Sequence, residues 1–279
     1  MLLRQACISL ACRPSKASVR LRIERGVRVL PLDTVIFLVT GALLAGFVMG
    51  LVGFGTGLAA LGFWLFAVDP VLAVPLVSIC SLATTAFTLK AYSHAINWRR
   101  LVPFFAGAVA GLPLGVLLLA RLDAGLFKTL MGLFLIAYTL FRLLVLPNLT
   151  LTKAGRAGDA LVGIGGGVLG GFAAIPGPLT TVWCGLRGWT KDEQRAVYQP
   201  FNQTIILLAF AGYATQGIIT AELGLLAFYC VPASLVGMAA GMAGYKRISE
   251  AQFQRLVLWL LLASGIMLVI LNAFSAGGR

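Results

Sequence analysis

Two glycine-rich segments interrupt long apolar stretches of this chain, and their residues are the best candidates for chemistry. The first runs through Gly53-Phe-Gly-Thr-Gly57 and the second through Ile175-Pro-Gly-Pro178. Glycine and proline weaken a helical ladder and leave backbone N–H and C=O groups without partners. A short helix that restarts after such a break presents free N–H groups and the positive end of its dipole, and this arrangement suits an anion.

Neutral polar side chains near these breaks could replace the water around an anion without adding charge. We assign substrate binding to nine residues: Thr56, Gly57, Ser78, Gly177, Pro178, Thr180, Thr181, Asn202 and Gln203. For Ser78 and the two amides, hydrogen bonding between helices is an equally good interpretation. The hydroxyls of Ser81, Thr84 and Thr85 are expected to bond to carbonyls of their own helix.

The composition places these breaks in a membrane protein. Of the 279 residues, 59% are hydrophobic and 11% are charged, against about 25% charged residues in soluble domains. Asp, Glu, Lys and Arg are missing from five stretches, each long enough to span a bilayer: 101–120, 160–186, 196–221, 223–245 and 256–278. A soluble enzyme, a nucleic-acid-binding protein and a secreted disulfide scaffold are excluded, and the net charge of +13 reflects orientation in the membrane.

Residues that could hold a metal or act in catalysis are scarce. The five cysteines show no CxxC or His-paired spacing, so we expect neither disulfides nor a metal or other cofactor. The only histidine, His94, lies beside Trp98 in a polar connection that suits a bilayer interface. An enzyme would need a nucleophile with a base, paired carboxylates or metal ligands. We therefore expect no enzymatic activity.

A polar run from Pro147 to Asp159 separates two apolar blocks of similar length. We divide the chain into a basic N-terminal extension, a first transmembrane repeat, a cytoplasmic linker, a second transmembrane repeat and a C-terminal tail: 1–33, 34–146, 147–158, 159–273 and 274–279. Each block begins with an interrupted segment, at 34–68 and 159–186. Three helices follow in each, near 72–92, 101–120 and 124–146, and near 196–216, 222–244 and 252–273.

The two blocks resemble each other in sequence. Shifting the second block back by 126 residues places Gly237 on Gly111 and Gly241 on Gly115. The same shift aligns an arginine, a phenylalanine and a leucine: Arg247 on Arg121, Phe253 on Phe127 and Leu256 on Leu130. Agreement of glycines and an arginine in register predicts an internal duplication.

The positions of the basic residues predict the topology. The connections around residues 99–100, 153–156, 187–195 and 246–255 are rich in Lys and Arg, so we place them in the cytoplasm. Segment 159–186 then begins and ends inside as a re-entrant hairpin, and segment 34–68 begins and ends outside. The predicted fold is an all-α polytopic membrane protein with two inverted repeats, each a broken, re-entrant helical hairpin followed by three transmembrane helices.

The basic N-terminus conflicts with this topology. Residues 1–32 carry seven Lys and Arg against the single Glu24, which favours a cytoplasmic location. Three interpretations stay open: a removed or mis-assigned leader, a basic surface helix, or a segment 34–68 that crosses only once. We favour the first.

The order of these motifs resembles the sulfite exporter TauE/SafE family of membrane anion transporters. The resemblance covers about 34–273 and is carried by the paired glycine-rich starts, by Asn97-Trp98-Arg99 and by Gly111-x-x-x-Gly115 with its repeat. Thr56 stands where that family usually has a glycine. The resemblance implies transport of small sulfur-containing or organic anions, such as sulfite, sulfonates or thiosulfate, across a bacterial inner membrane.

The expected mechanism is secondary transport by alternating access, with the anion held at the N-termini of the two short helices. The expected partners are a small anionic substrate and the lipid bilayer, with no nucleic acid, and association of several copies is left open. A passive anion channel is the alternative, and a membrane-embedded enzyme is a remote one.

The topology can be tested with single cysteines. A cysteine near Gly188 and one near Arg247 should react only with a reagent added from the cytoplasmic side, because both connections are basic. A cysteine replacing Ala221, in a connection without Lys or Arg, should react only from the opposite side. Labelling of the first two positions from opposite sides would contradict the re-entrant hairpin.

Overall fold

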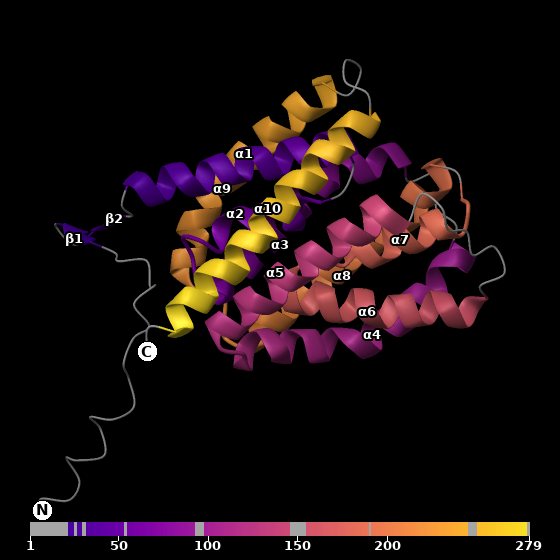
Figure 1. Cartoon of the computed structure of the whole chain (residues 1–279), viewed down its shortest axis with the longest axis horizontal. Helices are drawn as coiled ribbons and strands as arrows, with labels where there is room; N and C mark the ends of the chain where they lie inside the picture. The colour runs from indigo at the N-terminus through magenta and orange to yellow at the C-terminus, as the bar shows by residue number, and fades with distance from the viewer. Residues whose placement is uncertain are drawn as a thin grey trace, which may run out of the picture.

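The computed structural model describes residues 22–24, 27–29, 32–52, 55–92, 98–145, 155–189, 191–244 and 250–277. Within these ranges the protein is helical, apart from a short antiparallel pair of strands, β1 (Arg22–Glu24) and β2 (Val27–Val29). The helices are α1 (Leu32–Val52), α2 (Thr56–Trp64), α3 (Pro70–Tyr92), α4 (Trp98–Arg121), α5 (Ala124–Leu140) with a π-helical turn η2 (Phe141–Val145), α6 (Arg156–Ala173), α7 (Gly177–Leu186), α8 (Lys191–Thr215), α9 (Ala221–Gly244) and α10 (Glu250–Gly277) (Figure 1).

The order of elements is the same in the two halves of the chain. A long helix and a short helix are followed by three long helices in each half, first α1 to α5 and then α6 to α10. This order matches the predicted one, and the predicted boundaries agree with the observed ends to within a few residues for most helices. The predicted linker lies largely outside the described residues, as do Gly53, His94 and Arg247.

Each half begins with a hairpin whose two arms differ in length. In the first hairpin the Trp64 indole N–H near the end of α2 donates to the Leu38 carbonyl of α1 at 3.1 Å. In the second, the Trp183 indole N–H of α7 donates to Asp159 of α6 at 2.7 Å. Because the end of each short helix lies beside the early part of the long one, each short helix doubles back along its partner.

The backbone at both breaks adopts left-handed conformations. Gly55, before α2, has φ 101°, and Ala174, after α6, has φ 54°. Glycine takes such a conformation without strain, whereas an alanine there is disfavoured by about 1–2 kcal/mol. Strained backbone of this kind persists where the surrounding structure holds it and is common at functional sites.

Glycines bring the long arm of each hairpin into backbone contact with a helix of the other half. A side-chain carbon at any of them would collide with a backbone oxygen of the neighbouring helix. The pairs are α4 with α6, through Gly107, Gly111, Gly115, Gly163, Gly167 and Gly171, and α1 with α9, through Gly46, Gly50, Gly237 and Gly241. Figure 1 shows α4 beside α6 along one edge of the molecule and α1 with α9 on the opposite side. These glycines therefore serve close helix packing, as small-xxx-small patterns do.

The contacts also give the relative directions of these helices. Gly107 faces Ala160 and Gly115 faces Val168, so α4 and α6 run parallel. Gly46 faces Ser234 and Gly50 faces Met238, so α1 and α9 run parallel as well. These directions agree with those required by two inverted halves. The inversion relative to the bilayer stays a prediction, which the labelling experiment above tests.

The helices have the length and the surface of membrane spans. Among the described residues, five stretches are long and apolar enough to cross a bilayer: Thr34–Leu51, Pro70–Phe87, Trp98–Arg121, Ala124–Leu144 and Ala221–Gly244. Large apolar side chains stand exposed on the outside, among them Phe228 at 73% and Leu161 at 68%. Apolar side chains so exposed over several helices suit contact with lipid.

Candidate functional site

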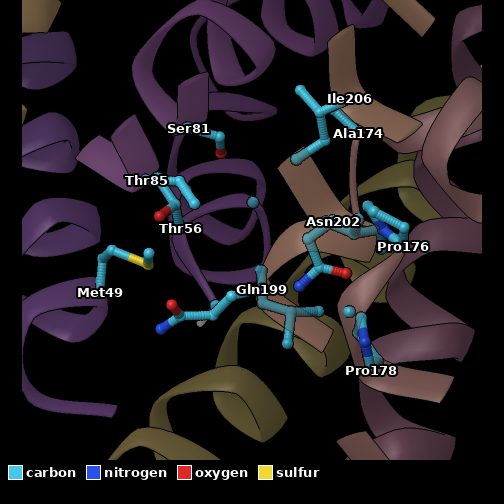
Figure 2. A pocket seen from close by; sticks show the side chains of 15 residues that line it. Met49, Thr56, Ser81, Thr85, Ala174, Pro176, Pro178, Gln199, Asn202 and Ile206 are labelled. Atoms are coloured by element: carbon cyan, nitrogen blue, oxygen red, sulfur yellow. The ribbon is translucent and has the colours of Figure 1, made fainter. Parts of the chain in front are cut away.

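The two breaks meet at one small cavity in the middle of the molecule (Figure 2). It measures about 40 Å³, which is room for roughly three water molecules or a small anion. The first turn of α2 lines it from one half, and the start of α7 lines it from the other. Side chains from α1, α3 and α8 complete the wall, so both halves of the chain contribute to one site.

Neither short helix has a side-chain cap at the end that faces the cavity. The N–H groups in the first turn of a helix have no carbonyl partner within the helix. On α2 these belong to Thr56, Gly57 and Leu58, all of which line the cavity. On α7 the fixed ring of Pro178 removes one donor, and Gly177 stays at the wall. The first half therefore offers more backbone donors than the second.

Two amide side chains of α8 complete the polar wall. Gln199 is 2% exposed, and the oxygens of Gln199 and Asn202 are buried without a hydrogen-bond partner. A buried amide without partners costs free energy, about 1–3 kcal/mol per unpaired group. Figure 2 shows both amides beside the cavity, with Asn202 near Pro176 and Pro178. An amide oxygen accepts hydrogen bonds, so these oxygens suit a donor such as water, and the NH₂ groups of the two amides are the donors that an anion could use.

The opposite wall carries hydroxyls and apolar groups. Ser81 and Thr85 of α3 and Met49 of α1 lie across the cavity from the α7 start (Figure 2). All the lining residues belong to the described part of the chain, and none of them is Asp, Glu, His, Lys, Arg or Cys. The described residues contain no group of three or more possible metal ligands. A ligand in this cavity would meet neutral hydrogen-bonding groups and helix ends, with no charged side chain at the wall.

Five of the nine predicted binding residues line this cavity: Thr56, Gly57, Gly177, Pro178 and Asn202. The other four lie outside its wall. The Thr180 and Thr181 hydroxyls donate to the Gly177 carbonyl at 3.0 and 2.8 Å, and the Ser78 hydroxyl donates to Val74 at 3.2 Å. The Gln203 oxygen is buried without a partner, one position beyond Asn202.

Sequence reasoning missed Gln199 and assigned Ser81 and Thr85 to bonds within their own helix. Thr84 does make such bonds, to Cys80 and Ser81, whereas Ser81 and Thr85 line the cavity. The spacing of four between these two residues places both on one helix face, and this was a usable signal. Gln199 precedes Pro200 near the charged start of α8, and the predicted site did not include it.

The fold and the cavity define a helical membrane protein with a central cavity between two broken hairpins, an arrangement that membrane transporters use. Residues 38–268 match the family model described as Sulfite exporter TauE/SafE. The match covers most of the chain, so the chain belongs to this family of membrane anion transporters. Comparison with curated proteins and with solved structures finds no match.

The α8 amides can be tested by truncation. Asn202→Ala and Gln199→Ala should each weaken sulfite binding to the purified protein about fivefold or more, because each removes an amide worth about 1–3 kcal/mol when buried. Binding can be measured by thermal shift or titration calorimetry. Gly57→Leu is a poor probe of binding, because its side chain would collide with Ile175.

The matched control is Gln203→Ala, which truncates the next buried amide of the same helix outside the cavity wall. It should change the affinity less than twofold. Equal losses in the three variants would show that amide burial in α8, and not contact with the anion, controls binding.

Proposed function

We propose that this protein is a secondary transporter of small sulfur-containing or organic anions, of the sulfite, sulfonate and thiosulfate class, in a bacterial inner membrane. The observation that supports this most directly is the meeting of two uncapped helix starts, one from each half, at a single buried cavity. Each start presents positive dipole and free N–H groups to the same point.

The chemistry of the wall favours an anion over a cation. A bare cation at membrane depth is normally held by carboxylates or backbone carbonyls, and no carboxylate lines this cavity. An anion needs donors, and the wall offers backbone N–H groups of α2, the hydroxyl of Ser81, and the NH₂ groups of Gln199 and Asn202. The small volume suits a compact oxyanion better than a bulky one.

The arrangement of the halves supports alternating access. In the proposed cycle the two hairpins hold the anion while one half moves relative to the other, and water reaches the cavity first from one side and then from the other. The glycine contacts of α4 with α6 and of α1 with α9 join each hairpin to the opposite half. Each hairpin would then move together with the helix to which it is packed.

Flux across a membrane separates this carrier from a passive channel. Protein in liposomes loaded with unlabelled sulfite should take up external labelled sulfite faster than protein in empty liposomes. During exchange the carrier returns to the outward-facing state with sulfite bound, and this avoids the slower return of the empty carrier. Thiosulfate and a small sulfonate should be tested in the same way, with sulfate and acetate for comparison. Equal uptake into loaded and empty liposomes would contradict a carrier, and no uptake of any anion would contradict the proposal as a whole.

A further inference from the structure

A second cavity, of about 310 Å³, lies at the end of α7 remote from the central site. Its lining consists of four arginines, one aspartate and one tryptophan: Arg99, Arg100, Arg156, Arg187, Asp159 and Trp189. They come from the starts of α4 and α6 and from the connection between α7 and α8. The ten residues of α7, about 15 Å of helix, separate this arginine cavity from the central one.

The two carboxylates at the arginine cavity leave an excess of positive charge. Arg100 forms an ion pair with Glu193 at 2.8 Å. Asp159 is 4% exposed, and one of its oxygens accepts the Trp183 indole N–H at 2.7 Å. Four guanidinium groups therefore face two carboxylates among the described residues, and the net charge of this cluster is about +2.

Trp189 holds two of the arginines in place. The guanidinium of Arg100 lies 4.9 Å from the centre of the indole ring, and that of Arg187 lies 5.5 Å from it. Stacking of this kind fixes the orientation of a guanidinium group. The Nη1 atom of Arg187 is buried and has no hydrogen-bond partner among the described residues.

Helix dipoles add to the same positive field. Arg99 and Arg100 lie in the first turn of α4, and Arg156 is the first residue of α6. Cations near a helix N-terminus are unfavourable, because that end carries about half a positive charge. A preference for basic residues on the cytoplasmic side explains their presence in these connections, but it does not require that they converge on one cavity around one indole.

We propose that the arginine cavity binds an oxyanion of the phosphate or sulfate type. Planar guanidinium groups pair with two oxygens of such an anion at once, and the Arg187 guanidinium, fixed over Trp189 with its Nη1 atom unpaired, suits this geometry. Two sources carry this chemistry, the phosphate of an anionic lipid head group and a soluble oxyanion. A lipid is a reasonable source, because Trp98 and Val102 of α4 are exposed nearby at 64% and 62%.

The test uses the full chain, purified in neutral detergent, at constant ionic strength maintained with chloride. Asn202→Ala is present throughout to weaken anion binding in the central cavity, and the comparison of variants is made on that background. Titration calorimetry measures the affinity for inorganic phosphate, inorganic sulfate and dioctanoyl phosphatidylglycerol, with dioctanoyl phosphatidylcholine as the zwitterionic comparison. The double variant Arg99→Gln with Arg156→Gln removes two exposed guanidinium groups, and Arg121→Gln at the other end of α4 is the matched control.

The double variant should bind at least tenfold more weakly than the parent, and Arg121→Gln should change the affinity less than twofold. Saturable binding of phosphate or sulfate supports a soluble oxyanion as a source, and binding of phosphatidylglycerol alone supports a lipid head group. Absence of binding of all three anionic probes, or equal affinity in the parent and the double variant, would overturn the proposal. Neither result depends on whether the central cavity transports sulfite.

Discussion

A polar backbone group inside a bilayer must find a partner within the protein, and this constraint governs the structure. Continuous helices meet it without help, whereas a broken helix does not. The described residues of both breaks, at 55–57 and 174–177, line one cavity between the two halves. At the end of α6 a side chain supplies such a partner. The Tyr213 hydroxyl donates to the carbonyls of Gly170 and Gly171 at 3.1 and 2.7 Å. The free N–H groups of α2 and α7 lack such partners, and they are the groups that an anion can satisfy.

The glycine contacts hold the two breaks together. Hydrophobic burial does not distinguish one helix contact from another in lipid, so close backbone packing carries much of the association. Equivalent glycines make equivalent contacts in the two halves: Gly46 meets Ser234 and Gly167 meets Ala108, at positions that differ by 121 and 126 residues. Each hairpin is thus held by the opposite half, and the two short helices are brought to the same point. The central site exists only when both halves are assembled.

The sequence predicted the membrane class, the order of helices and the location of both breaks, because composition and glycine spacing act locally. Of the hydroxyls that line the cavity it predicted Thr56, but not Ser81 or Thr85. Thr180 and Ser81 look alike in sequence, yet one bonds to the carbonyl of Gly177 and the other lines the site. Packing between the two halves decides which face of α3 or α8 turns toward the cavity. The pattern of residues within one helix does not predict that face. The place of Gln199 in the cavity wall could not be predicted for the same reason.

The location of the anion is the most direct test of this account. Selenite is a heavier analogue of sulfite, and its anomalous scattering would mark its position in crystals of the protein grown in a lipid phase. The account predicts a peak between the first turn of α2 and the start of α7, within hydrogen-bond distance of Asn202. A peak found only away from both helix starts, with the central cavity occupied by water, would contradict it.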